Sequence, residues 1–583
     1  MMGLHLDEKT LENIRAARTY KGIPPDEHLV PYENFADLLE KHVAEKPDKV
    51  YLIHYDADGN RETFTYAELN ARVNRIANFL VNELGVRRGD RVATIGYNHS
   101  DLVAIYFACW KVGATVAPQN VAEDDERIGY ILRNSESVVV FARPEYLERA
   151  ERIVHGEQPI ENIREIIEVG GEPCEEYRNL SVEMQKQPPE FTAPEPVTLE
   201  DESLLVYTSG TTGPPKGVVL IQYNMLADAK GIAEHHRITP DQRMMCVLPI
   251  HHVNGTIVTL VTPLFVGAST VLNRAYSSSR FWERIARENV QIVSVVPTLL
   301  QYSLEYAEKA GEEGRSIWGE GVRREDLANF RHLICGAGTL AVALATRFEE
   351  TFGFPIMHGY GLSETTCYSC FLPLDLDWET HRHWMKDYGY PSIGVPIWPN
   401  EMAIFDAEGE GRRLGPGERG EICIRGHNVM KYYFRRPDAN AETFKFGWFR
   451  SGDEGFYEVD EQGRTFFFIT GRIKELINRG GVKFSPFDIE EVILELPEVN
   501  TALAIAFEND YYGEEVGAYV VLNEGERLTA EEIIEHCRSR MTFEKSPKVV
   551  VFGTEVPVTS TGKYQRLKLR ELFREWQHTQ FRP

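Results

Sequence analysis

The first part of the chain alternates between helical and strand-like patterns of apolar residues. Over 34–44, apolar side chains recur at helical spacing behind Asn34, a residue type favoured at the N-cap of a helix. A second amphipathic helix is predicted over 66–83, following Thr65, a residue type that caps helices, and residues 91–97 are predicted to form a short strand. This alternation up to about residue 185 predicts βαβ units, which build parallel sheets.

A proline-rich segment separates this part from a second α/β block. Residues 187–196 carry four prolines, which is typical of a surface linker. The second block runs from Leu204 to about Met357, and its apolar runs 290–296 and 332–334 indicate buried strands.

The pattern changes again between residues 394 and 470. Short alternating strands are interrupted there by glycine turns, which predicts a small β-rich subdomain. We therefore predict an α/β fold in which residues 1–471 form a large N-terminal domain. This domain contains two βαβ-type sheet blocks and the β-rich subdomain.

Residues 472–583 are predicted to form a separate, small α+β domain. Ser485 followed by Pro486 is a typical helix start, with serine as N-cap and proline at the first helical position. Thr529 and Glu532 have the spacing of a capping box before a second helix.

The composition is that of a globular protein with a strongly acidic surface. The 583 residues are 43% hydrophobic, which allows a large core and two or more domains. The 63 basic and 89 acidic residues leave a net charge of −26, which disfavours nucleic acid and anionic membranes as partners. An anionic substrate would therefore need a local basic pocket.

The sequence contains no pattern that we recognise as a targeting, membrane or disulfide signal. Residues 1–15 lack the apolar core of a signal peptide, and no run of about eighteen apolar residues occurs. The eight cysteines show no disulfide framework, and we interpret the lone pair Cys367 and Cys370 as structural rather than zinc-binding. We expect a cytoplasmic protein without a transmembrane segment.

The strongest chemical signal is the loop between the apolar runs 204–206 and 218–221. Glycines and hydroxyls crowd around one lysine there, and free backbone N–H groups, hydroxyls and an ammonium group together suit a polyphosphate. The residues predicted to hold the phosphates are Thr208, Ser209, Gly210, Thr211, Thr212, Gly213 and Lys216.

This loop differs from a Walker A loop. Pro214 and Pro215 stand before Lys216, and Gly217 takes the place of the magnesium-binding hydroxyl, which argues against a P-loop kinase. A flexible surface loop is the other interpretation. The eleven-residue string 207–217 resembles the phosphate-binding signature of the adenylate-forming superfamily, which includes acyl-CoA synthetases, adenylation domains of peptide synthetases, and luciferases.

Further segments match this superfamily in the same order, from residue 248 to residue 566. In segment 248–255, His252 matches a histidine of the superfamily. His251 stands where the superfamily usually has an aromatic residue before that histidine. The acyl pocket that the resemblance implies is lined by His252, Gly255, Thr298, Gly336 and Gly361.

Other matches concern the nucleotide. In segment 358–365 the resemblance makes Tyr360 a flat partner for the purine and Glu364 a ligand of Mg²⁺, together with Thr208. Relatives usually have threonine where Ser363 stands. Beyond the phosphate loop, the ATP-binding residues implied by the resemblance are Gly336, Ala337, Gly338, His358, Gly359, Tyr360, Gly361, Ser363, Asp453, Arg472 and Lys563.

The C-terminal matches imply a mobile domain. Lys474 falls at the position of the superfamily's hinge, and Gly480 with Gly481 would let the pantetheine arm of CoA pass. Lys563 resembles the adenylation lysine, which acts from the small domain. The catalytic residues implied are therefore Lys563, Glu364 and His252.

Together these matches imply an acid–CoA ligase that uses ATP, Mg²⁺ and CoA. A carboxylate would attack the α-phosphorus of ATP, releasing pyrophosphate, and a thiol would then displace AMP from the acyl-adenylate. The nearest alternative is an enzyme that loads a separate carrier protein. A luciferase-type oxygenase, a non-catalytic nucleotide-binding scaffold and a kinase are more distant alternatives. The motifs do not identify the carboxylic acid substrate, and they weakly favour an apolar monoacid. A homodimer is the expected assembly if the protein is oligomeric.

Overall fold

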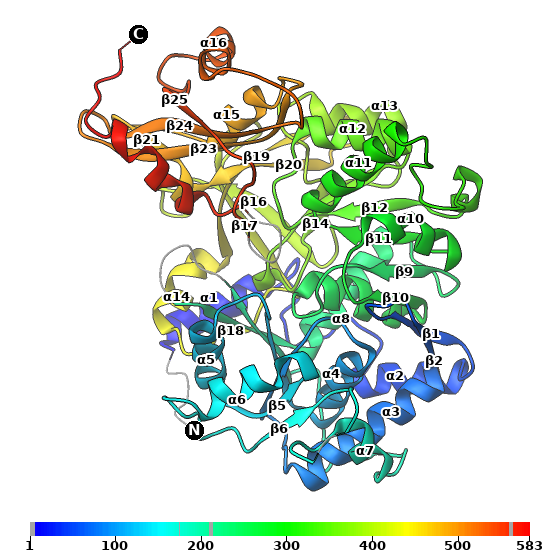
Figure 1. Ribbon diagram of the computed structural model, residues 1–583. Helices are drawn as coiled ribbons and strands as arrows, with labels where there is room; N and C mark the ends of the chain where they lie inside the picture. Colours follow the sequence, from blue (N-terminus) through cyan, green and yellow to red (C-terminus); the bar gives the residue numbers. More distant parts are fainter. Residues whose placement is uncertain (1–5, 174, 209–213, 559–563, 583) are drawn as a thin grey trace.

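The computed structural model describes residues 6–173, 175–208, 214–558 and 564–582 (Figure 1). The blue and cyan segments, from the first third of the chain, lie in the lower half of this view, and the orange and red C-terminal part lies at the upper left, beside green segments from the middle of the chain. Four β-sheets can be followed in the described residues.

The largest sheet in the described residues has nine strands, and β9 to β13 run parallel to one another in it. In spatial order its strands are β15 (Val395–Pro396), β14 (Cys370–Phe371), β13 (Ile356–Tyr360), β12 (His332–Cys335), β11 (Ile292–Val295), β9 (Arg243–Cys246), β10 (Ser269–Asn273), β1 (Val50–Tyr55) and β2 (Arg61–Thr65).

A second sheet of seven described strands faces it across a shared core. Its strands are β18 (Tyr432–Tyr433), β8 (Lys216–Ile221), β7 (Glu202–Thr208), β4 (Thr115–Gln119), β3 (Arg91–Ile95), β5 (Ser137–Ala142) and β6 (Glu165–Glu168).

Two smaller sheets follow along the chain. The β-rich subdomain contains β16 (Asn400–Phe405), β17 (Gly420–Gly426), β19 (Phe449–Val459) and β20 (Thr465–Arg472). The C-terminal sheet contains β22 (Val482–Phe484), β21 (Ile477–Arg479), β24 (Gly513–Leu522), β23 (Val499–Asn509) and β25 (Val549–Phe552).

The helices cover the faces of these sheets. They are α1 (Glu8–Ala17), α2 (Phe35–Glu45), α3 (Tyr66–Asn78), α4 (Ser100–Val112), α5 (Asp125–Asn134), α6 (Leu147–His155), α7 (Leu180–Gln185), α8 (Gln222–His235), α9 (Thr262–Val266), α10 (Ser278–Arg287), α11 (Pro297–Glu312), α12 (Val342–Phe352), α13 (Trp378–Lys386), α14 (Pro437–Thr443), α15 (Pro486–Ile493) and α16 (Ala530–Arg540).

The predicted α/β fold is confirmed, but the two large sheets divide the chain differently from the predicted blocks. β7 and β8 follow the linker and nevertheless join the sheet of β3 to β6, whereas β1 and β2 precede it and join the sheet of β9 to β13. The predicted boundary between residues 185 and 204 is therefore wrong as a boundary between sheets. Strands pair where their backbone edges meet in space, and local apolar patterns carry no information about the partner.

The proline-rich segment 187–196 does not run free between the blocks. The side-chain amide of Asn74 in α3 donates to the carbonyl of Pro189 at 2.8 Å, and that of Asn78 donates to Glu190 at 2.8 Å. These bonds hold the segment against α3.

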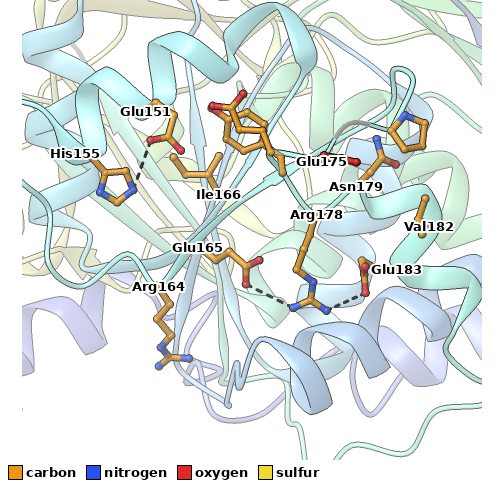
Figure 2. A pocket seen from close by; sticks show the side chains of 13 residues that line it. Glu151, His155, Arg164, Glu165, Ile166, Glu175, Arg178, Asn179, Val182 and Glu183 are labelled. Atoms are coloured by element: carbon orange, nitrogen blue, oxygen red, sulfur yellow. Dashed lines mark hydrogen bonds and ion pairs between the residues drawn. The ribbon is translucent and has the colours of Figure 1, made fainter.

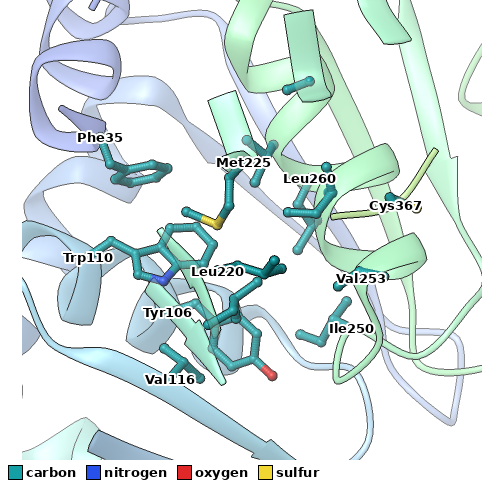
Figure 3. Packing of buried hydrophobic residues seen from close by; sticks show 14 of the residues in the cluster. Phe35, Tyr106, Trp110, Val116, Leu220, Met225, Ile250, Val253, Leu260 and Cys367 are labelled. Atoms are coloured by element: carbon teal, nitrogen blue, oxygen red, sulfur yellow. The ribbon is translucent and has the colours of Figure 1, made fainter. Parts of the chain in front are cut away.

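The main core lies between the two large sheets, with α4 and α8 in the middle layer. Every residue of α4 is buried, which explains why its sequence is apolar on all sides rather than amphipathic. Figure 3 shows Phe35, Tyr106 and Trp110 packed together with Leu220 and Met225 in this layer. The strands of a parallel sheet are covered on both faces, so their sequences are almost continuously apolar.

Local sequence signals for helix starts are confirmed. Asn34 caps α2 by accepting from the backbone of Asp37, and Thr65 with Glu68 forms a capping box at α3. Ser485 caps α15, and Thr529 with its partner forms the capping box of α16.

The C-terminal sheet and its helices touch the N-terminal part through α15. Asp488 pairs with Arg419 at 3.3 Å, and a carboxylate oxygen of Glu491 accepts from the backbone N–H of Val342 at 3.4 Å. Val342 is the first residue of α12, so a side chain from one end of the chain caps a helix from its middle.

Within the described ranges, no helix combines the length and the apolar character needed to cross a lipid bilayer. The described cysteines are all free and buried.

Candidate nucleotide and acyl site

The predicted nucleotide-binding residues gather where three sheets meet. Tyr360 ends β13 and Gly336 follows β12, so both stand at the carboxyl ends of parallel strands, where open α/β sheets bind ligands. Asp453 and Arg472 come from the four-stranded sheet, and Lys216 begins β8 of the seven-stranded sheet.

Asp453 lies at the centre of a buried polar group. It is fully buried, the Tyr360 hydroxyl donates to its Oδ2 at 2.5 Å, and Arg472 Nε pairs with its Oδ1 at 2.7 Å. Asp453 and Arg472 are cross-strand neighbours in the β19–β20 ladder, so the hairpin itself sets their pairing. The structure therefore brings these three predicted residues together.

A second group surrounds Lys216. Its ammonium nitrogen lies 4.3 Å from the ring centroid of Tyr433, and the Tyr433 hydroxyl donates to Glu364 Oε1 at 2.7 Å. Burial lowers the pKa of Lys216 from its ordinary value, while the nearby Glu364 carboxylate opposes that shift. Tyr433 therefore contacts both Lys216 and Glu364, which come from distant segments of the chain.

Tyr433 was not predicted from the sequence. It lies in the two-residue strand β18, which pairs with β8 and is thereby placed beside Lys216. The aromatic pair Tyr432 and Tyr433 carries no motif, so only strand pairing assigns it to the site. Tyr368, described below, was not predicted either, and only the tertiary contacts of its hydroxyl place it near the site.

The residues near Lys216 fit a magnesium ion only together with a nucleotide. Among the described residues, no group of three or more His, Cys, Asp or Glu side chains could hold a metal ion. Mg²⁺ usually binds one or two carboxylates plus substrate phosphates, and the single buried carboxylate of Glu364 suits that pattern. The Thr208 hydroxyl donates to the carbonyl of Lys216 at 3.4 Å, at the base of the phosphate loop.

His358 is buried in a defined tautomer. Its Nδ1 lies 2.9 Å from the carbonyl oxygen of Ser392, which can only accept, so Nδ1 carries the proton. Burial lowers the pKa of His358 to about 4, and the neutral ring leaves Nε2 as an acceptor. This is the tautomer that can accept from the amino group of adenine.

Several predicted site glycines are required by protein packing. A Cβ on Gly255 would meet the carbonyl of Pro249, and one on Gly361 would meet the carbonyl of Cys367. A Cβ on Gly336 would lie 2.6 Å from the Tyr368 hydroxyl, and one on Gly359 would meet Phe371. These contacts give a structural reason for glycines that the sequence interpretation placed in the nucleotide and acyl sites.

Gly338 and Ala337 behave differently. The nearest atom to a Cβ on Gly338 would be Pro297 Cδ at 3.4 Å, an ordinary contact. Ala337 has a φ of +65°, a left-handed conformation that is uncommon for alanine. Pro297 begins α11, so this loop lies beside the helix that carries Thr298.

The predicted acyl-pocket segment forms a buried polar network. Asn254 donates to the Tyr368 hydroxyl at 3.2 Å and accepts from Ser294 at 2.6 Å. His252 is half-buried, and its ring centroid lies 4.3 Å from that of His251. Burial lowers the pKa of His251 to about 4, so this histidine is neutral near pH 7.

The hinge and the CoA glycines lie in two different places. Lys474 occupies a short 3₁₀ helix directly after β20, and its charge is close enough to lower the pKa of Lys216. Gly480 and Gly481 have φ values of +59° and +92° and form the two-residue turn between β21 and β22. Such a turn needs positive φ at both positions, which glycine allows without strain.

Some predicted residues fall outside the described residues. They are Ser209, Gly210, Thr211, Thr212 and Gly213 of the phosphate loop, and Lys563. Ser363 is described and begins the short helix that carries Glu364.

Comparison with known proteins places these observations in a family. A model described as AMP-binding enzyme matches residues 39–434, and one described as AMP-binding enzyme C-terminal domain matches residues 488–563. An oxalate–CoA ligase of Arabidopsis thaliana is 31% identical over 93% of this chain and 99% of its own length. A feruloyl-CoA synthase of an Amycolatopsis species is 32% identical over 87% of this chain and 94% of its own.

A solved structure agrees with the sequence comparisons. The anthranilate–CoA ligase AuaEII in complex with anthranoyl-AMP superposes with a TM-score of 0.80 at 25% identity, covering 94% of this chain and 98% of that chain.

Proposed function

This chain belongs to the AMP-binding enzyme family, and from that premise we propose how its residues carry out the reaction. It is an AMP-forming acid–CoA ligase that makes an acyl-adenylate from a carboxylic acid and ATP and then transfers the acyl group to CoA. The observation that supports the assignment of roles is the convergence of Lys216, Glu364, Tyr360, Asp453 and Arg472 from separate segments on one site.

The proposed roles follow from charge and position. Asp453 accepts from the ribose hydroxyls, with Arg472 and Tyr360 holding its carboxylate in place. Lys216 neutralises charge on the β- and γ-phosphates, and the loop from Thr208 supplies backbone and hydroxyl donors. Catalysis of adenylation is then mainly positioning and charge neutralisation.

Glu364 would hold Mg²⁺ against the phosphates, and the ion would neutralise charge that develops on the departing pyrophosphate. Tyr433 orients this carboxylate by donating to Oε1 and leaves Oε2 for another partner. Lys563 would neutralise charge between the acid and the α-phosphate.

The small domain would begin at residue 472 and change its orientation between the two half-reactions. Lys474 is the proposed hinge, because it follows β20 directly and precedes the C-terminal sheet. The orientation described here places the charge of Lys474 near Lys216.

The family does not set the acid, since relatives named for oxalate, ferulate and anthranilate differ widely. We propose an apolar monocarboxylic acid, because the predicted pocket residues include no lysine or arginine that could pair with a second carboxylate; they are His252, Gly255, Thr298, Gly336 and Gly361. The acceptor is proposed to be free CoA, and the free, buried cysteines suit a reducing compartment such as the cytoplasm. We also propose that the chain forms a homodimer.

The assignment of Lys563 is tested by separating the half-reactions. We expect Lys563→Ala to abolish acid-dependent ATP–pyrophosphate exchange while thioester formation from supplied acyl-adenylate is retained. Equal loss of both half-reactions would contradict the role.

The function as a whole is tested by a panel of short, medium, long-chain and aryl acids. Pyrophosphate release is measured with and without CoA, and free CoA is compared with a holo carrier protein as acceptor. AMP rather than ADP as product excludes a kinase. Failure of every acid to release pyrophosphate would refute the proposed function.

A further inference from the structure

A second pocket lies on the opposite edge of the nine-stranded sheet from the nucleotide site. Its cavity of about 250 Å³ opens at the amino ends of β12 and β13, where Arg331 and Pro355 precede the strands. The nucleotide site is built at the carboxyl ends of the same strands. The pocket volume is below the range of about 300–1,000 Å³ that holds drug-sized ligands, which favours a compact ligand.

The charge of this pocket is opposite to that of the molecule. Its lining includes Arg237 and Arg331 but no aspartate or glutamate, although the chain carries a net charge of −26. Among the described residues, no carboxylate forms an ion pair with either guanidinium. Two uncompensated cations in one concave site attract an anion.

The larger cavity of about 450 Å³ in the seven-stranded sheet is a contrast (Figure 2). Five glutamates line it, and Arg178 lies between Glu165 and Glu183 with ion pairs to both. Neighbouring glutamates thus already neutralise Arg178, and this cavity does not indicate an anion-binding site.

Arg331 is held in place by neutral groups only. Its Nη2 donates to the carbonyl of His236 at 2.9 Å, and its Nη1 donates to the side chain of Gln242 at 3.1 Å. These contacts fix the guanidinium without neutralising its charge. Burial and the charge of the neighbouring Arg237 lower the pKa of Arg331 from its ordinary value.

Arg237 occupies a strained backbone position. It follows the C-cap of α8 with a φ of +49°, a left-handed conformation that favours glycine. An exposed arginine there costs stability that a glycine would not. Such an outlier beside a pocket points to a role for the side chain.

The rest of the lining suits a flat apolar body. Met357, Leu374 and Leu376 are part of the lining, and Trp378 is 39% exposed beside them. The Trp378 ring stacks on His381 with an interplanar angle of 11°, and His381 is held by Glu349 at 2.7 Å. The aromatic surface is therefore fixed.

We propose that this pocket binds a compact organic anion, a carboxylate on a planar apolar body, at a site separate from the nucleotide and acyl site. Arg237 and Arg331 would bind the carboxylate, while Trp378 and the apolar lining would contact the body. This inference does not depend on the ligase reaction.

The test measures binding of benzoate by isothermal titration calorimetry to the full-length protein. Arg237→Gly removes the cation and suits the left-handed backbone, so it should keep or raise Tm. We expect it to weaken one class of benzoate site at least tenfold while ATP–pyrophosphate exchange is unchanged. Trp378→Ala is expected to weaken the same class.

Lys21→Gly is the matched control, because Lys21 is another exposed cation with a positive φ, +47°, and does not line the pocket. It should leave benzoate binding unchanged. Inorganic phosphate and benzyl alcohol, which carry the charge and the body alone, should bind at least tenfold more weakly than benzoate. Benzoate binding that is absent, or unaffected by Arg237→Gly, or equalled by phosphate would overturn the proposal.

Discussion

Asp453 shows how much of the site depends on one side chain. It accepts from Tyr360 and pairs with Arg472, and all three come from different strands. Replacement by asparagine keeps the shape and removes the charge, so the ion pair with Arg472 is lost.

We expect Asp453→Asn to lower kcat/KM for ATP in the exchange assay by roughly ten- to hundredfold, because hydrogen bonds to charged groups contribute about 1.5–3 kcal/mol. Asp460→Asn is the matched control, since Asp460 lies in the turn of the same hairpin and pairs with Arg464. Normal ATP affinity in Asp453→Asn would contradict the ribose role.

The site glycines divide into those that protein packing requires and those that have room for a Cβ. Gly361→Ala would drive its Cβ into the Cys367 carbonyl, so we expect the free energy of unfolding to fall by at least about 1–3 kcal/mol. Gly338→Ala meets only Pro297 at ordinary distance and should leave Tm unchanged. Urea denaturation of both variants, with exchange activity measured in parallel, tests the division.

If Gly338→Ala keeps its stability and loses exchange activity, the ligand passes beside Gly338. If Gly361→Ala is stable and active, the backbone around Gly361 can shift to accommodate the Cβ. That result would contradict the prediction that packing against Cys367 requires a glycine.

At the scale of elements, the contact between α15 and α12 joins the C-terminal part of the chain to the N-terminal part. Glu491 accepts from the first N–H of α12, and burial, with Glu490 and Glu495 nearby, raises its pKa to about 8. A carboxyl whose pKa is raised on docking favours the docked arrangement while it is protonated. That contribution is complete below its ordinary pKa near 4.5 and is lost as pH rises through about 8.

We therefore expect small-angle X-ray scattering to show a more extended wild-type enzyme at pH 9 than at pH 6.5. Glu491→Gln, which is neutral at both values, should remove most of this change. Glu531→Gln in the exposed first turn of α16 is the control and should behave like wild type. An unchanged profile for wild type would show that Glu491 does not govern docking.

At the scale of the whole molecule, the proposed function requires the small domain to change its orientation relative to the rest of the chain. Lys474 sits in a single turn of 3₁₀ helix between β20 and the C-terminal sheet, and proline there would fix its φ and restrict Ile473. We expect Lys474→Pro to slow thioester formation at least tenfold more than adenylation. Separate assays of the two half-reactions measure this ratio.

Lys474→Ala is the control, since it removes the side chain and leaves the backbone free. Equal rates for Lys474→Pro and wild type in both half-reactions would count against a hinge at this residue.

The sequence alone determined the features that depend on near neighbours in the chain. Helix starts at Asn34, Thr65, Ser485 and Thr529 were predictable because a cap needs only residues within one turn. The α/β class was predictable from local apolar patterns, and the acid–CoA ligase activity was predictable from the resemblance of short motifs to the adenylate-forming superfamily.

Only the tertiary structure decided which strands share a sheet, that Tyr433 lies between Lys216 and Glu364, and that Cys367 and Tyr368 explain the nearby glycines. These relations join residues far apart in the chain. They are set by strand pairing and close packing in space, which apolar periodicity and short motifs do not record.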